Sequence, residues 1–156
     1  MRLSIVAVGV RMPQWVREAY DDYARRLKPR LPITLTELQA GKRTASGDDA
    51  RAVADEGRRI INAIRRDDYV VALDERGRQR STLELSVWLG DRLREGRDTS
   101  LLIGGPDGFA PEVLERAQES WSLSRLTLPH ALVRVLLIEQ LYRAVTVLDG
   151  HPYHRE

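Results

Sequence analysis

The stretch LLIGGPDGF, residues 101–109, is the segment from which the fold of this chain is most readily interpreted. Three large apolar residues lead directly into Gly104 and Gly105, with Gly108 close behind. A buried strand of an open parallel sheet often ends in this way, at the edge where ligands bind. Glycines there let the backbone approach a flat or phosphate-bearing ligand. The same residues also suit an ordinary tight turn between a strand and a helix, so both interpretations stay open.

Short apolar runs alternate with longer helix-period segments on both sides of this stretch, which is typical of an α/β fold with a largely parallel sheet. We expect strands at 3–9, 33–38, 69–73 and 99–103, and helices after Pro13, around 53–64, after Ser81, from Pro111 and at about 132–148. Ser81 and Glu84 form the spacing of a capping box. The polar stretch 41–49 is expected to be a loop. No linker divides the chain, so we predict a single domain, 1–156.

The composition excludes some functions and permits others. No apolar run approaches the ~20 residues needed to span a bilayer, and there is no cysteine. We therefore expect a cytoplasmic protein with no membrane segment, no disulfide, no thiolate nucleophile and no metal. The formal net charge is +2 and the sequence pI is about 9.2, which permits a nucleic-acid partner without deciding for one.

Two common nucleotide sites are excluded by their missing motifs. The chain has no G-x-x-x-x-G-K-[ST], so a P-loop is not predicted. The first strand is followed by VGVRMP and lacks G-x-G-x-x-G, so a dinucleotide site there is not predicted either. A cofactor would have to sit at the later strands.

Two further features lie near the C-terminus. In SLSRLTLPH, residues 122–130, hydroxyl residues alternate with leucines. This pattern favours an ordinary strand with one solvated face, although a loop that presents backbone groups and leucines to an adenine would look alike. The three histidines are His130, His151 and His154, and the chain ends in HPYHRE. Such a terminus is either a solvated tail or an RNA contact in which a tyrosine stacks on a base.

LLIGGPDG, SLSRLTLPH, EQLYRA and PYHRE, in this order, resemble the small SPOUT methyltransferases of the ribosomal RNA large subunit methyltransferase H family. VAVG, AGKR and Leu73-Asp74 also match, whereas Ala131 stands where the family often has proline. The resemblance implies a parallel sheet with helices on both faces, a C-terminal trefoil knot and a homodimer. It also implies that S-adenosylmethionine is the cofactor and that the substrate is N3 of a pseudouridine in 23S rRNA, within the assembled 70S ribosome.

The same resemblance implies residue roles. The cofactor site would comprise Leu73, Gly104, Gly105, Leu123, Ser124, Arg125, Leu126, Thr127 and Leu128. The last helix would form the dimer contact, and the tail would reach the partner's pocket. Tyr153 and Arg155 would bind RNA, by stacking and by contact with phosphate or a base edge. Arg134 would either face the RNA or pair with acids across the dimer.

Methylation of N3 requires its imide proton to leave, and His130 is our first candidate to accept it because the reference pKa of histidine is ~6.5. Glu139 and His154 are alternatives, bulk water is another, and a capping role beside Pro129 is also open for His130.

Two other functions remain possible. The chain could be a SPOUT methyltransferase for another RNA such as tRNA, or a ribosome-associated binding protein without catalysis.

Overall fold

The computed structural model describes residues 1–47 and 49–155, so Asp48, in the predicted loop, and Glu156, in the predicted tail, lie outside the described residues. Its elements in chain order are β1 (Leu3–Val8), α1 (Gln14–Leu27), β2 (Ile33–Leu38), α2 (Ala50–Ala63), β3 (Tyr69–Gln79), α3 (Thr82–Glu95), β4 (Thr99–Ile103), α4 (Pro111–Arg116), β5 (Glu119–Ser122), α5 (His130–Leu148) and the 3₁₀ helix η1 (Pro152–His154). No helix within the described ranges is both long and apolar enough to cross a membrane.

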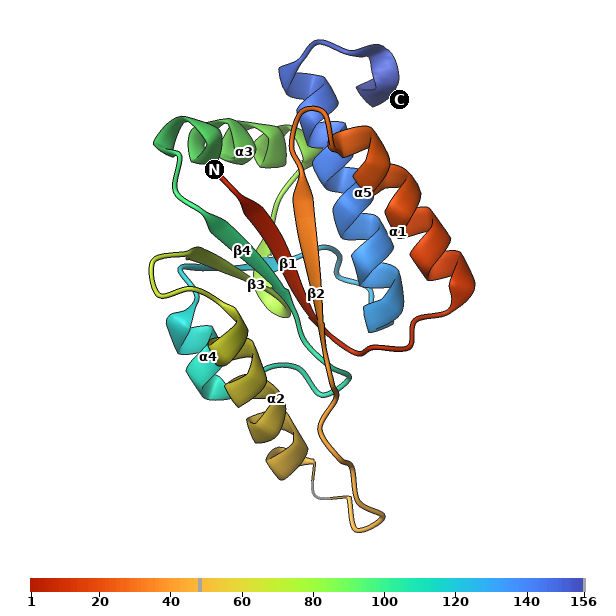
Figure 1. The fold of residues 1–156 in the computed structure, drawn as a ribbon, viewed down its shortest axis with the longest axis vertical. Helices are drawn as coiled ribbons and strands as arrows, with labels where there is room; N and C mark the ends of the chain where they lie inside the picture. The colour runs from red at the N-terminus through yellow and green to blue at the C-terminus, as the bar shows by residue number, and fades with distance from the viewer. Residues whose placement is uncertain (48, 156) are drawn as a thin grey trace.

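The five strands form one sheet in the order β2-β1-β4-β3-β5, and every adjacent pair is parallel. Helices cover both faces of this sheet (Figure 1). The α/β prediction with a parallel sheet and helices on both faces is thus confirmed. Because all strands point the same way, the loops that follow them meet at one edge, the carboxyl edge, where open sheets bind ligands.

Two apolar clusters hold the layers together. One cluster joins the sheet to α1, α3 and α5, and includes Leu27, Leu89 and Leu141, each fully buried. The other joins the opposite face to α2 and α4 through Ile60 and Val113. Strands buried on both faces read as continuous apolar runs, which is why the sequence predicted them.

The start of α3 is fixed as its sequence predicted. The Glu84 backbone N–H donates to Ser81 Oγ at 3.1 Å, and the Ser81 N–H donates to Glu84 Oε2 at 2.7 Å. These two bonds satisfy donors that a helix N-terminus otherwise leaves open. The helix ends at Gly96, whose φ of 73° suits a residue without a Cβ.

Two strand predictions were wrong. β3 continues past residue 73, and its pairing with β5 is interrupted between Leu73 and Arg78. Gly77 allows β3 to come back beside β5 after this interruption, because a Cβ on Gly77 would lie 2.6 Å from the β5 backbone. Residues 123–128 are a loop and not a strand. Ser122 Oγ donates to the Ser124 carbonyl at 2.8 Å, and Ser124 Oγ accepts from the Leu126 N–H at 3.0 Å; such local bonds compete with strand pairing.

A single carboxylate, that of Glu119, binds several side chains around the first residue of β5. Glu119 accepts hydrogen bonds from the Tyr69 hydroxyl, from Trp88 Nε1 at 2.8 Å and from Trp121 Nε1 at 3.1 Å, and it pairs with Arg80. Burial by itself would raise the pKa of Glu119, but these bonds outweigh it and lower the pKa to about 2. The charged form is therefore favoured in the folded protein.

We expect Glu119→Gln to reduce the free energy of unfolding at pH 7 by about 1–2 kcal/mol, after allowance for partial solvent screening. Since the folded-state pKa lies below the ordinary 4.5, the contribution of Glu119 is present above that value and is lost as the pH falls towards about 2. Urea denaturation at several pH values measures both effects. Glu115→Gln, at an exposed position on α4, is the control, and equal stability of wild type and Glu119→Gln at pH 7 would contradict the prediction.

Candidate functional site

A cavity of about 390 Å³ opens at the carboxyl edge, where β4 and β5 end and the pairing of β3 with β5 is interrupted after Leu73. Three chain segments line it, 73–76, 103–109 and 121–128, although they are far apart in sequence. His130 and Val133 complete the wall from the first turn of α5. This volume lies within the roughly 300–1,000 Å³ of small-molecule sites.

The cavity brings together nearly all of the residues that sequence analysis assigned to the cofactor. Those on its wall are Leu73, Gly104, Gly105, Leu123, Ser124, Leu126, Thr127 and Leu128. Arg125 is exposed and is not one of the lining residues. The roles of these residues stay predictions, but their common location is a finding.

Sequence reasoning missed the acidic and aromatic part of the wall. Asp74, Glu75 and Asp107 line the cavity, as does the ring of Phe109. Asp74 directly follows the apolar run 69–73 of β3, a position that could have marked it, and only 11% of its side chain is exposed. The cavity therefore combines apolar surfaces, which suit a flat ring, with carboxylates, which suit a positively charged group.

The glycines of the cavity are required by its geometry. Gly105 and Gly108 pair as an isolated bridge, with the Gly108 N–H donating to the Gly105 carbonyl at 3.1 Å. A Cβ at Gly104 would lie 3.2 Å from the Phe109 ring, and one at Gly105 would lie 2.9 Å from Glu56 Oε1. Side chains at Gly104 and Gly105 would therefore crowd Phe109 and Glu56, and their absence leaves the backbone groups of the turn near the cavity.

Arg134 lies inside the protein and not on its surface. Its residue exposure is 1%, and its Nη2 donates to the Gly9 carbonyl at 2.7 Å and to the Val8 carbonyl at 3.3 Å. Its Nη1 pairs with Glu37 at the end of β2. These contacts favour a structural role for Arg134, joining α5 to β1 and β2, over the predicted contact with RNA.

His130 shares a face of α5 with Arg134, one turn earlier, and borders the cavity. A Cβ placed on Gly9 would lie 3.8 Å from His130 Nε2, so the imidazole lies close to the end of β1. Burial lowers the pKa of His130 below its ordinary 6.5, and the positive charge of Arg134 lowers it further, against a smaller opposing effect of Glu56. The ring is therefore neutral at pH 7.

Glu139 and Tyr153 lie together, away from the cavity. The Tyr153 hydroxyl donates to Glu139 Oε1 at 3.1 Å and lies 3.2 Å from the hydroxyl of Tyr23. Arg143 binds the same carboxylate, with Nε–Oε1 at 2.9 Å, and its guanidinium stacks 4.9 Å from the centre of the Tyr153 ring. Burial, followed by these hydrogen bonds, raises the pKa of Tyr153.

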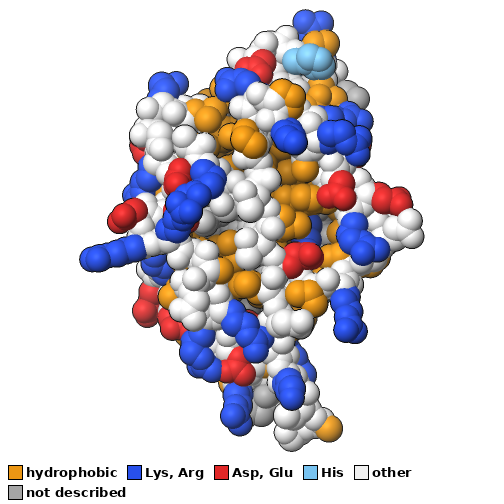
Figure 2. Space-filling view, in the orientation of Figure 1, with side chains coloured by type: hydrophobic (Ala, Val, Ile, Leu, Met, Phe, Trp, Pro, Cys, Tyr) orange, Lys and Arg blue, Asp and Glu red, His pale blue; other side chains and the backbone are white. Residues whose placement is uncertain are grey.

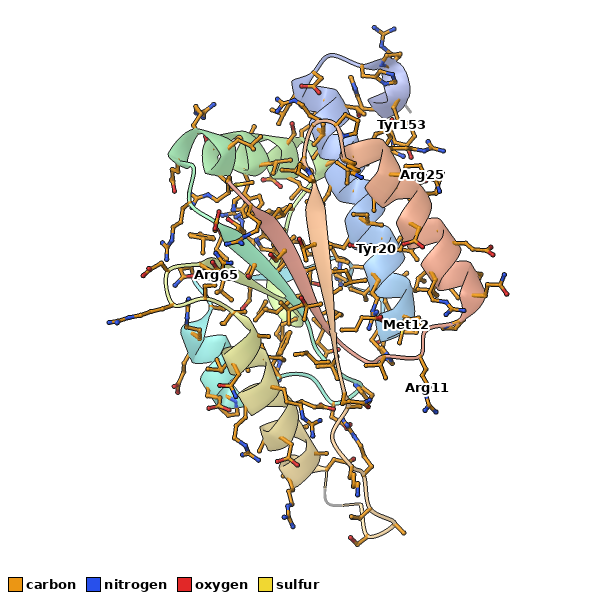
Figure 3. The ribbon with its side chains drawn as sticks, in the orientation of Figure 1. Arg11, Met12, Tyr20, Arg25, Arg65 and Tyr153 are labelled. Carbon is orange, nitrogen blue, oxygen red and sulfur yellow. The ribbon has the colours of Figure 1, made fainter. Side chains whose placement is uncertain are left out.

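The tail and the cavity are at opposite ends of α5. Tyr153 packs edge-on against Tyr142, at a ring distance of 4.7 Å. Tyr142 is twelve residues after His130, which is about 18 Å along a helix. Figure 3 shows Tyr153 at one end of the α1–α5 pair, with Arg11 and Met12 at the other. The structure therefore does not bring His130 together with Glu139.

The remaining tail residues also lie away from the cavity of their own chain. His154 is half-buried in η1, and its Nδ1 has no hydrogen-bond partner within the described residues. Arg155 follows η1 and is exposed. Among the described side chains, no group of three or more His, Asp or Glu residues is arranged to hold a metal ion.

The comparison with protein families decides the affiliation. A family model described as "Predicted SPOUT methyltransferase" matches residues 1–154. The chain belongs to the SPOUT methyltransferase family. This membership makes it an enzyme of the methyltransferase class, which is consistent with a cofactor-sized cavity at the carboxyl edge.

Relatives and solved structures agree with this membership in the SPOUT family. The chain is similar to two proteins named "Ribosomal RNA large subunit methyltransferase H", from Methylococcus capsulatus and Thioalkalivibrio sulfidiphilus. It is 53% identical to each, over 99% and 100% of this chain and 100% of both relatives. A probable methylase family protein from Haemophilus influenzae has the same fold, with a TM-score of 0.56 and 15% identity over 97% of this chain and 69% of the other.

Proposed function

We propose that this SPOUT enzyme transfers a methyl group from S-adenosylmethionine to N3 of a pseudouridine in 23S rRNA, within the assembled 70S ribosome. The observation that carries the proposal is the cavity formed jointly by 73–76, 103–109 and 121–128. These are the segments in which the resemblance expects the cofactor. The names of the full-length relatives support ribosomal RNA of the large subunit as the substrate class.

The lining of the cavity fits S-adenosylmethionine. Leu123, Leu128 and Phe109 offer apolar surface for the adenine faces, and the glycine turn offers backbone groups for its edges. Asp74 and Glu75 offer negative charge, which favours the sulfonium and the amino group, whereas Asp107 is paired with Arg43. The cofactor supplies an electrophilic methyl group, so the protein has to align the acceptor nitrogen and remove its proton.

His130 is suited to accept that proton. Its ring borders the cavity and is neutral at pH 7, because burial and Arg134 lower its pKa below 6.5. S-adenosylmethionine, held by the cavity wall, would supply the methyl group, and the imidazole of His130 would accept the proton that N3 loses. Glu139 is bonded to Arg143 and Tyr153 and lies about 13 Å further along α5, so it is the weaker candidate.

A homodimer would bring the tail to a cavity. Tyr153 and Arg155 lie at the far end of α5 from their own His130, so in the proposal they serve the cavity of a second copy. The first half of α5 also presents partly exposed apolar side chains next to the cavity, Leu132, Val133, Val135 and Leu136. Burial of these residues against a second copy would form an apolar interface beside the cavity.

Unpaired basic side chains at the carboxyl edge support an RNA substrate. Arg11, Lys42 and Arg125 follow β1, β2 and β5, and each is exposed without an ion pair to any described residue. Figure 2 shows several Lys and Arg side chains at the lower end of the molecule, where the loop between β2 and α2 lies in Figure 1. Exposed cations of this kind bind backbone phosphate.

The proposal predicts methyl transfer from labelled S-adenosylmethionine to 70S ribosomes that lack this modification. Mass spectrometry should locate the label on N3 of a 23S pseudouridine, and transfer to naked 23S rRNA should be slower. A single domain with this little basic surface needs the assembled particle to define its target. Label in tRNA only would contradict the proposed substrate, and a chain that binds no cofactor would support the non-catalytic alternative.

The role of His130 is tested by single-turnover kinetics. We expect His130→Ala to lower the rate by about 100-fold or more, as for loss of a general base, with little change in cofactor affinity. In the wild type the rate should fall as the pH drops through a midpoint below 6.5, because the ring then becomes protonated. A variant with a near-normal rate would show that water takes the proton instead.

A further inference from the structure

The loop after β2 is tied to α2 through a buried carboxylate, Glu56. Only 2% of Glu56 is exposed. Its Oε2 accepts from the Gly41 backbone N–H at 2.9 Å and from Arg43 Nη1 at 2.5 Å, and its Oε1 accepts from Arg43 Nη2 at 3.2 Å. Both oxygens of the carboxylate therefore accept hydrogen bonds from the loop.

Arg43 extends this contact to the cavity. Its Nη2 donates to Asp107 Oδ2 at 3.0 Å, and its Nε donates to the same atom at 3.3 Å. Asp107 lies in the glycine turn and lines the cavity. One guanidinium thus joins the loop, α2 and the turn that is expected to hold the cofactor.

Glu56 also contacts the turn directly. A Cβ at Gly105 would lie 2.9 Å from Glu56 Oε1 and 3.2 Å from Oε2, so the backbone of the turn rests against the carboxylate. Gly105 accepts the turn's own bond, from the Gly108 N–H at 3.1 Å. The conformation of the turn is consequently restrained at Gly105 by Glu56 and at Asp107 by Arg43.

The ion pair between Glu56 and Arg43 provides the buried charge of Glu56 with a partner. A buried carboxylate is costly without a cationic partner, and removal of that partner leaves the charge uncompensated. The hydrogen bond to Glu56 raises the pKa of Arg43, with a further contribution from Asp107. The guanidinium of Arg43 is therefore charged where it lies between Glu56 and Asp107.

We propose that Glu56 and Arg43 are positioning residues that hold the 105–108 turn in its cofactor-binding conformation and so set the affinity for S-adenosylmethionine. A turn that is ordered before binding loses less conformational entropy when the ligand arrives. The apolar contacts of Ile60 and Val113 already hold α2 and α4 to the sheet, whereas the ion pairs lead to a residue of the cavity wall. This inference rests on the proposed function for the identity of the cofactor.

The test is isothermal titration of the full-length chain with S-adenosylmethionine and S-adenosylhomocysteine. Glu56→Gln keeps the shape of the side chain but releases Arg43, and should raise both dissociation constants about tenfold, the scale of one lost charge-assisted bond. In turnover assays KM for the cofactor should rise similarly, while kcat at saturation should change less than about threefold. Asp55→Asn, the neighbouring acid on α2, whose ion pair is with Arg58, is the matched control and should leave affinity unchanged.

Asp107→Asn replaces the carboxylate that accepts from Arg43 Nε and Nη2, leaves Glu56 in place, and serves as the second variant if Glu56→Gln fails to fold. A raised dissociation constant with an unchanged melting temperature supports the positioning role. Wild-type affinity in a folded Glu56→Gln, or in Asp107→Asn where Glu56→Gln does not fold, overturns it, since the network would then serve stability alone. Failure of the wild type itself to bind either compound overturns the proposed function, a result distinct from failure of the inference.

Discussion

The buried guanidinium of Arg134 fixes where the last helix meets the sheet. It binds the carbonyls of Val8 and Gly9 at the end of β1 and the carboxylate of Glu37 at the end of β2. A charge at this depth is stable only with such partners, so α5 must begin at the carboxyl edge. This constraint brings His130 to the cavity and sends the other end of α5, with the tail, to the far side of the molecule.

Much of the fold was predictable because its signals are local. The wholly buried β4 reads as a continuous apolar run, and the Ser81 capping box marks the start of α3. The strand predicted at 123–128 was wrong. Alternating hydroxyl and leucine residues suit a strand, but Ser122 and Ser124 form hydrogen bonds with neighbouring backbone groups, and the segment is a loop. The trefoil knot remains a prediction of the resemblance, since no periodicity in a sequence encodes a knot.

The candidate site was only partly predictable, because some of its residues stand in local motifs and others are brought together by packing. The glycines and leucines of the cavity could be identified because they stand together in motifs. Glu56 could not, since its contacts to Arg43 and Gly105 depend on how α2 packs against β1, β2 and α4. The assignment of Arg134 to RNA shows the same limit: a basic residue beside a motif suggests a ligand contact, but burial next to Glu37 gives it a structural partner.

Purified mixed dimers test most directly whether the tail of one copy completes the cavity of another. One subunit would lack residues 151–156, and the other would carry Gly105→Val, whose side chain would collide with Glu56. Each variant alone should be inactive on 70S ribosomes. The mixed dimer should regain about half of the wild-type activity, because one of its two sites has an intact cavity and an intact tail. A mixed dimer no more active than either variant alone would contradict the account.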